Sequence, residues 1–240
     1  DNAVKVYWST GGQVRPPHDQ AIIDCVMSTT EILRSDFRAA VNEGNVVLCK
    51  EETDNAFFSE LVDQSVAGPR DVHILYSPLH GVGASAVCPV LKLAGFSNVE
   101  LFELHAEPNG DFPNVPNHVA NPENAAVFDS IIERAKQVRA DLILVTDPDC
   151  DRLGCAAPLT QDPTGPWRTF SGNQLGALLA DYLLEQRRQT GRLEADDYIV
   201  KTLVTSEMLR RIADSYGVRT CGDLLVGFKW IAGVMDEQGP

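Results

Sequence analysis

The chain has 240 residues, a length that predicts one or two domains, and 44% of its residues are apolar, which is typical of a globular protein. No apolar run approaches the roughly 20 residues that are needed to cross a bilayer. The net charge of −14 argues against nucleic acid or an anionic membrane surface as a partner, but a few local Lys and Arg side chains could still hold an anionic substrate.

The first quarter of the chain has a weak pattern. Residues 4–8 alternate as in a strand, and the glycine pair at residues 11–12 predicts a turn. Apolar residues at helical spacing predict a helix over residues 20–41, with a break near residues 28–30. Residues 43–54 are acidic and irregular and read as a linker, and a helix is expected over residues 55–66.

Strands and helices then alternate. Buried strands are predicted at residues 71–76, 99–103 and 141–146, with helices between them over residues 84–95 and from Asn121 to about Arg139. A return strand follows at residues 152–157. This order predicts a parallel sheet with helices on its faces, and ligands bind at the carboxyl ends of the strands in such sheets.

A second unit of the same style follows a polar linker at residues 160–165. We expect it to open with a short strand at residues 167–170 and a helix that Ser171 caps. Strands at residues 198–204 and 218–221 alternate with two further helices, the last running towards Gln238. The fold class predicted is therefore α/β, with two consecutive three-layer α/β/α units, mainly parallel sheets and a remnant of a preceding α/β domain.

The loop after the strand at residues 141–146 carries three alternate carboxylates, Asp147, Asp149 and Asp151. They repel one another, and a hard divalent cation such as Mg²⁺, or Mn²⁺, would compensate their charge best. Pro148 disfavours a helical conformation at Asp147 and so keeps the segment a loop. Arg152 adds a fixed cation that is suited to a bidentate grip on phosphate.

Other interpretations of this loop fit less well. An EF-hand calcium loop would need Gly and Glu where this chain has Arg152 and Pro158, so we reject it. An aspartyl-phosphate phosphatase also begins with Asp-x-Asp after a strand, but a third Asp and an Arg fit that signature poorly. A solvated acidic turn and a non-catalytic metal-binding module remain as alternatives.

A second motif suggests a different class of protein. Gly81-Val82-Gly83-Ala84-Ser85-Ala86 lies between a predicted strand and helix and matches the dinucleotide-binding pattern Gly-x-Gly-x-x-Ala, with Glu103 near the expected ribose-binding acid. A dinucleotide-binding oxidoreductase domain is therefore an alternative. The same glycines serve any tight turn whose helix faces an anion, and Ser77-Pro78-Leu79-His80 ahead of them is foreign to dinucleotide domains.

The chain has six cysteines without a Cys-x-x-Cys pair, and its five histidines are scattered. These features argue against a zinc site and favour reduced thiols in a cytoplasmic protein. The N-terminal residues show no signal sequence. Only His80 falls in a candidate site loop, and the other histidines are interpreted as structural.

Five stretches, in this order, resemble the α-D-phosphohexomutases, the family of phosphoglucomutases and phosphomannomutases. They are residues 5–8, residues 77–83, the metal loop at residues 147–152, residues 171–176 and residues 227–231. The resemblance covers nearly the whole chain. It implies that residues 1–50 are the tail of domain one, residues 51–162 are domain two with the metal loop, and residues 163–240 are part of domain three.

The resemblance also implies a reaction and roles for single residues. The family moves a phosphoryl group between a phosphoserine and a hexose monophosphate through a bisphosphorylated sugar, which interconverts hexose 1-phosphate and hexose 6-phosphate. Mg²⁺ on the three aspartates, with Lys5 and Arg152, would serve the transfer. Lys201 and the loop Gly227-Phe228-Lys229 would contact the sugar phosphate, with the choice between glucose and mannose left open.

The family's phosphoserine loop would precede Asp1, and its fourth domain would follow Pro240. We therefore expect the 240-residue chain to be inactive by itself, but to fold and to bind a divalent ion weakly.

Overall fold

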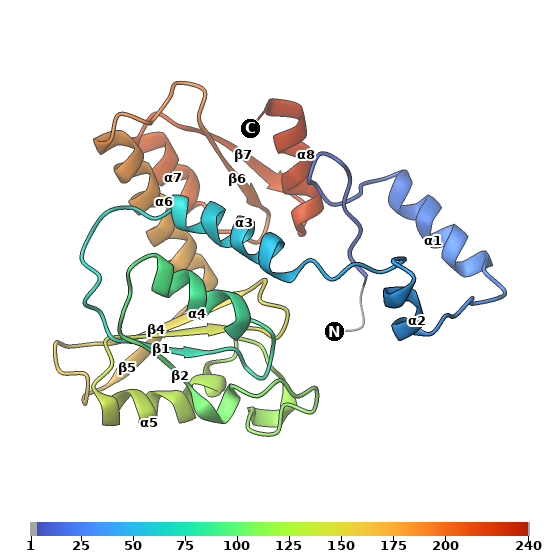
Figure 1. Ribbon diagram of the computed structural model, residues 1–240. Helices are drawn as coiled ribbons and strands as arrows, with labels where there is room; N and C mark the ends of the chain where they lie inside the picture. Colours follow the sequence, from blue (N-terminus) through green and yellow to red (C-terminus); the bar gives the residue numbers. More distant parts are fainter. Residues whose placement is uncertain (1–3, 240) are drawn as a thin grey trace. The chain divides into compact units, whose positions relative to one another are not determined.

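The computed structural model describes residues 4–239 (Figure 1). The chain divides into two compact units, each described by itself below. The first unit is Lys50–Gly176. The second unit combines residues 4–49 with residues 177–239, as far as the structure describes them.

A five-stranded sheet forms the centre of the first unit, in the order β2-β1-β3-β4-β5. The central strand β1 pairs in parallel with β2 and β3, whereas β4 pairs antiparallel with both β3 and β5. The strands are β1 (Ile74–Ser77), β2 (Val99–Leu101), β3 (Leu142–Thr146), β4 (Leu153–Pro158) and β5 (Trp167–Phe170).

Helices cover both faces of this sheet. In Figure 1, α4 (Ala84–Leu93) lies on one face with α3 (Lys50–Asp63) packed against it, and α5 (Asp129–Val138) lies on the other face. Short 3₁₀ turns occur at η1 (Glu103–His105), η2 (Pro116–His118) and η3 (Ala125–Phe128). The unit is therefore a three-layer α/β/α arrangement.

The core of the first unit lies between the sheet and α5. Ile143 and Val145, which alternate on β3, are fully buried in one cluster with Ile131 and Ala135 of α5. The same cluster includes Leu75, Leu79, Phe102, Val115, Val127, Phe128, Ala140 and Ala156. Burial on this scale fixes the strand register, because a shift by one residue would turn each apolar side chain to the other face.

The strand order places a switch point between β1 and β3. The chain leaves β1 through α4 to reach β2 on one side, and then returns through α5 to place β3 on the other side of β1. Ser77 at the end of β1 lies beside Val145 of β3. The loops that follow these two strands therefore leave the same edge of the sheet, at the position where open α/β sheets bind ligands.

The second unit contains a parallel strand pair, β6 (Tyr198–Thr202) and β7 (Arg219–Leu224). The helices α7 (Met208–Ser215) and α8 (Phe228–Gln238) pack on these strands. Helix α6 (Gly172–Gln189) begins in the first unit and ends in the second. Ser171 and Gln174 form a reciprocal capping box at its start, as the sequence predicted for Ser171.

Residues 4–49 include two helices, α1 (His18–Ser28) and α2 (Phe37–Asn42), and contact α8 through ion pairs. Arg15 lies 3.7 Å from Asp236 and 3.3 Å from Glu237. Gly233 leaves room for this arginine, because a Cβ at Gly233 would collide with the guanidinium of Arg15. The segment therefore packs within the second unit, a grouping that the sequence did not predict.

The α/β fold class is confirmed, and several boundaries differ from the prediction. Residues 4–8 form only an isolated bridge, Tyr7 with Gln13, so the predicted regular strand was wrong. Strand β5, which was expected to open the second unit, pairs with β4 in the first sheet. The first compact unit thus continues to Gly176, and the domain boundary at residue 162 that the family resemblance implies stays a prediction.

Two helices also begin at residues other than those predicted. Helix α3 begins at Lys50, inside the predicted linker. Helix α5 begins at Asp129 rather than near Asn121, because Asn121 and Asn124 accept hydrogen bonds from Glu123 and Ala126 and so stabilise local turns before the helix. None of the described helices combines the length and the apolar character that crossing a membrane requires.

Candidate metal and phosphate site

The loop between β3 and β4 has a conformation fixed by its own backbone. The Asp147 N–H donates to the carbonyl of Arg152 at 3.4 Å, and the Cys150 N–H donates to the carbonyl of Asp147 at 3.0 Å. Cys150 has a φ of 62°, which is the left-handed region. The loop therefore reverses the chain tightly enough for β4 to pair antiparallel with β3.

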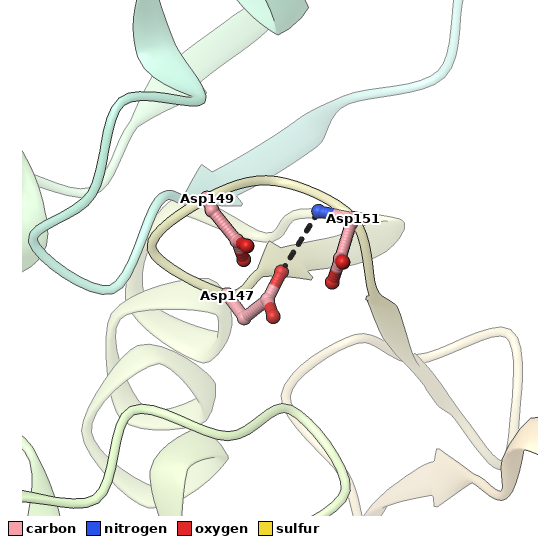
Figure 2. A group of neighbouring side chains, drawn as sticks. All are labelled: Asp147, Asp149 and Asp151. Atoms are coloured by element: carbon pink, nitrogen blue, oxygen red, sulfur yellow. Dashed lines mark hydrogen bonds between the residues drawn. The ribbon is translucent and has the colours of Figure 1, made fainter. Parts of the chain in front are cut away.

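The carboxylate of Asp147 is the centre of this loop. It is only 1% exposed, and its Oδ1 accepts from the backbone N–H groups of Asp151 at 3.0 Å and Arg152 at 2.9 Å. Figure 2 shows the first of these bonds. The Nε–H of Arg152 donates to Oδ2 at 2.7 Å. Three donors thus compensate the buried charge and hold the loop in one shape.

The other two carboxylates converge on Asp147. Asp149 and Asp151 are exposed, and one oxygen from each of the three residues lies within 4.8 Å of the others (Figure 2). Ligands on opposite sides of a divalent ion with metal–oxygen distances of about 2.0–2.6 Å are at most about 4–5 Å apart. The set of three hard oxygen donors therefore fits a divalent cation in both chemistry and spacing.

Arg152 adds a permanent cation beside these carboxylates. Its Nε lies 2.7 Å from Asp147 and 3.8 Å from Asp151, and about half of its side chain is exposed. The hydrogen bond to Asp147 raises the pKa of the Arg152 guanidinium further above its usual value. Since about half of the side chain is exposed, the guanidinium can also face an incoming anion.

The loop after β1 packs directly against the metal loop. The Val82 N–H donates to the carbonyl of Pro148 at 2.9 Å, and a Cβ at Gly81 would collide with the Pro148 backbone. A Cβ at Gly83 would collide with the Tyr76 hydroxyl and would lie 2.7 Å from Oγ1 of Thr146. Of the two glycines that suggested a dinucleotide, Gly81 therefore allows the close approach of the two loops, and Gly83 leaves room for the side chains of Tyr76 and Thr146.

Histidine 80 lies at the same edge of the sheet and is 5% exposed. Its Nδ1 must donate to the carbonyl of Glu107, 2.8 Å away, because a carbonyl only accepts. Its Nε2 is buried and has no hydrogen-bond partner among the described residues. His80 also lines a cavity of about 450 Å³ with Asn109, Phe112 and Asp149.

Sequence analysis missed the polar network behind this loop. His105 was interpreted as an ordinary structural histidine, and it is fully buried with its Nδ1 2.8 Å from the Ser77 hydroxyl. Its Nε2 donates to the carbonyl of Asn114 at 3.2 Å, which makes Nδ1 the acceptor. Burial lowers the pKa of His105. Ser77 and His105 are 28 positions apart in the sequence, and no sequence pattern links them, so the sequence could not predict this contact.

The remaining predicted site residues lie in the second unit. Lys5 is exposed, Gly227 is the N-cap residue of α8 with a φ of 127°, and Phe228 is exposed. Lys229 Nζ lies 3.2 Å from Asp19. Lys201 is buried, and its ammonium is bound by acceptors of its own unit. The structure thus brings Arg152 and the three aspartates together in one unit, and the other five residues belong to the second unit.

Comparison with known families explains this arrangement. Two models of one family match the chain in order: phosphoglucomutase/phosphomannomutase alpha/beta/alpha domain II at residues 55–159, and domain III of the same family at residues 171–239. Together they cover more than half of the chain. The chain belongs to the α-D-phosphohexomutase family. Within that family, the metal loop and both glycines of the neighbouring loop fall in the domain II match.

Curated relatives of the family align with almost the whole chain. A phosphoglucomutase of Staphylococcus saprophyticus is 30% identical over 99% of the chain, and a phosphomannomutase of Mycoplasmoides pirum is 29% identical over 96%. A human phosphopentomutase is 31% identical over 96%. The chain spans 42%, 41% and 38% of these three proteins, less than half of each.

Solved phosphohexomutase-type structures share the fold. A Thermus thermophilus protein provisionally named a phosphomannomutase matches 95% of the chain and 46% of its own length, with a TM-score of 0.67 and 20% identity. A Burkholderia thailandensis protein of the phosphoglucomutase/phosphomannomutase family matches 78% of the chain and 36% of its own length, with a TM-score of 0.60 and 19% identity. At these identities the likeness is one of fold.

Proposed function

We propose that the protein containing this chain is a Mg²⁺-dependent phosphosugar mutase that interconverts hexose 1-phosphate and hexose 6-phosphate. The proposed route runs through a phosphoserine and a bisphosphorylated sugar. The observation that carries the proposal is the convergence of Asp147, Asp149 and Asp151 beside Arg152, at the switch point of a domain that belongs to the mutase family. Mn²⁺ would suit the same three oxygen ligands.

The three aspartates would hold the ion by one carboxylate oxygen each. A bound divalent ion would act as a Lewis acid on the transferring phosphate. Phosphoryl transfer needs positioning and charge neutralisation more than covalent chemistry, and fixed groups supply these best. Asp147 meets this need because its three hydrogen bonds fix its orientation before any ligand arrives.

Arg152 is proposed to neutralise oxygens of the transferring phosphate. Its Nε is engaged by Asp147, which orients the guanidinium plane, and its raised pKa keeps it a cation throughout the neutral range. Lys5 is proposed as a second catalytic cation. Lys201, Gly227, Phe228 and Lys229 are proposed to contact the sugar phosphate, and a cytoplasmic location remains a prediction from the free cysteines.

Phosphopentoses are a second candidate substrate class. The relatives named phosphopentomutase are as similar to this chain as those named phosphoglucomutase, at 31% and 30% identity. Sequence identity therefore does not indicate whether the substrate is a six-carbon or a five-carbon sugar phosphate. The residues that would separate them lie in the second unit, around the loop at residues 227–229.

The test is a coupled mutase assay on the product of the complete gene. Glucose 1-phosphate, mannose 1-phosphate and ribose 1-phosphate are offered in turn with Mg²⁺ and a trace of the matching bisphosphorylated sugar. Turnover with one sugar that stops on addition of a chelator and returns with Mg²⁺ supports the proposal. An Asp149→Asn variant should lose this turnover, and an Asp141→Asn variant, which changes an exposed carboxylate before β3, should keep it.

Absence of turnover with all three sugars would overturn the hexose and pentose proposals. Metal binding is measured separately on the 240-residue chain, by isothermal titration with Mg²⁺ and Mn²⁺ and by the metal-induced rise in melting temperature. Binding that Asp149→Asn abolishes, without turnover on any phosphosugar, would favour the non-catalytic metal-binding module.

A further inference from the structure

The ammonium group of Lys201 has all three of its N–H donors directed at acceptors within the second unit. Its Nζ lies 2.7 Å from Oε1 of Glu207, 3.1 Å from the carbonyl of Thr205 and 3.4 Å from the carbonyl of Thr202. The side chain of Lys201 is 1% exposed. A lysine in this state has no donor left for a substrate until one of the three acceptors leaves.

Glu207 is the acceptor that can leave. The other two acceptors are backbone carbonyls: Thr202 ends β6, and Thr205 lies in the turn after it. The Thr205 N–H donates to the carbonyl of Thr202, so removing either carbonyl from Lys201 would require this turn to rearrange. The Glu207 side chain is 61% exposed and can rotate into water. Hydrogen bonds from Lys201 and Arg210 lower the pKa of Glu207, so it is a carboxylate at neutral pH.

Glu207 joins two cations rather than one. While Oε1 faces Lys201, Oε2 accepts from Nε of Arg210 at 2.8 Å. The carboxylate group therefore bridges an ammonium and a guanidinium, as one face of a phosphate group would. Asp223 and Asp214 are further carboxylates near Arg210, and Oδ2 of Asp223 lies 3.9 Å from Nη2.

The backbone of β7 is irregular beside this cluster. Val200 pairs with Cys221 and Thr202 pairs with Leu224, so Lys201 lies opposite the two residues Gly222 and Asp223. This is a β-bulge, and Asp223 has a φ of 63°. A Cβ at Gly222 would lie 2.5 Å from Nη2 of Arg210 and 3.6 Å from Cε of Lys201. The glycine thus lets both cationic side chains pack over the bulge.

We propose that Lys201 and Arg210 form a binding site for the phosphate group of the sugar phosphate, and that the Glu207 carboxylate fills this site until the phosphate displaces it. Arg210 was not among the site residues predicted from the sequence. The Glu207 carboxylate would compete with the phosphate for both cations. The inference rests on the proposed function for its ligand class and for the role of Lys201. A phosphate dianion would pair with both cations more strongly than one carboxylate does.

An internal competitor lowers the apparent affinity for phosphate, because only a fraction of the molecules has Lys201 and Arg210 released from Glu207 at any moment. Removing its charge while keeping its size should therefore tighten phosphate binding. The probe is inorganic phosphate, followed by glucose 1-phosphate, titrated into the 240-residue chain at constant ionic strength with EDTA present. Binding is followed by two-dimensional NMR of the backbone amides at residues 201–210.

Glu207→Gln should lower the Kd for both ligands at least fivefold, and Lys201→Met and Arg210→Gln should each raise it by at least the same factor. Glu185→Gln is the matched control, since Glu185 also pairs with an arginine of its own helix in the same unit. It should leave the Kd unchanged. Urea unfolding of each variant verifies that the fold is retained, and Arg210→Gln tests the site without altering a buried group.

Phosphate binding that is no tighter in Glu207→Gln than in the unsubstituted chain would overturn the inference, as would binding that is insensitive to Arg210→Gln. Because the titration contains EDTA, phosphate binding at Lys201 and Arg210 is measured independently of the Mg²⁺ site and of mutase turnover. Tighter phosphate binding in Glu207→Gln, with no turnover of any phosphosugar by the complete gene product, would support the anion site and contradict the mutase proposal.

Discussion

Gly81 and Pro148 are in such close contact that a single methyl group on Gly81 would overlap the Pro148 backbone. The hydrogen bond from the Val82 N–H to the carbonyl of Pro148, 2.9 Å long, joins the same two loops. The loop after β1 and the metal loop after β3 therefore hold each other in place. Because Gly81 has no side chain, the loop after β1 can approach Pro148 this closely, and the contact helps to position Asp149, the next residue.

Replacing Gly81 by alanine should consequently destabilise the first unit and displace the metal loop. Because the clash is with backbone atoms, we expect a loss of at least about 2 kcal/mol in the free energy of unfolding, in the range of overpacked cores. Urea unfolding measures this loss. Gly110→Ala is the control, since a Cβ there meets no atom within 4 Å. Equal stability of the two variants would contradict the close contact.

The aspartates of the metal loop should differ in what their loss does. Asp147→Asn replaces a buried acceptor of three hydrogen bonds, so it should lower stability by about 1–3 kcal/mol and also abolish metal binding. Asp149→Asn alters an exposed carboxylate and should abolish metal binding with a smaller loss of stability than Asp147→Asn. Urea unfolding is measured with and without about 5 mM Mg²⁺, a concentration several times the Kd of a weak Mg²⁺ site, and this comparison separates the two effects. Two variants with the same stability would argue against the structural role of Asp147.

The stability of the first unit should depend on pH through His105. Burial lowers its pKa in the folded state, so below the ordinary value of 6.5 the unfolded chain binds the proton more readily. Stability is therefore complete above about pH 6.5 and falls as the pH drops from there towards the folded pKa, by at most about 1.4 kcal/mol per pH unit.

Urea unfolding between pH 8 and pH 5 measures this dependence, and a His105→Gln variant removes the titrating group. The difference in stability between the variant and the unsubstituted chain should shrink as the pH falls. His118→Gln, which changes an exposed histidine of the same unit, is the control and should leave the pH dependence as it is. A constant difference between chain and variant across this range would contradict the burial effect.

The cysteines should differ sharply in reactivity. Burial raises the pKa of Cys155 to about 11, whereas Cys25 and Cys49 are exposed. The thiolate is the reactive form, so at pH 8 only about one Cys155 thiol in a thousand would be reactive. A thiol-exchange reagent should modify Cys25 and Cys49 rapidly and Cys155 only after unfolding in urea. Rapid modification of Cys155 in the native protein, located by mass spectrometry, would contradict its burial in β4.

The sequence was informative where one residue type decides the structure. The branched apolar run at residues 141–146 predicted β3, and the three aspartates after it predicted the acidic cluster. Ser171 predicted the start of α6, and the structure adds Gln174 as its partner in a capping box. Each of these signals is local, so it can be recognised without knowledge of a partner far along the chain.

It was least informative where a distant partner decides. Strand β5 joins the first sheet because β4 offers it an antiparallel edge, and its four residues carry no sign of that choice. The glycines at positions 81 and 83 match a dinucleotide pattern, and only the contact with Pro148 and Tyr76 shows their role. The bridge of Glu207 between Lys201 and Arg210 likewise depends on a helix, a turn and a bulge meeting in space.

The three hydrogen bonds that Asp147 receives from its own loop have a consequence for kinetics. If the loop binds an ion in the shape that these bonds hold, capture of the ion needs no prior conformational step. Association should then be limited by how fast the hydrated ion sheds its water, which is slower for Mg²⁺ than for larger divalent ions. Stopped-flow traces on mixing should accordingly show a single phase, whose rate rises in proportion to ion concentration without reaching a plateau.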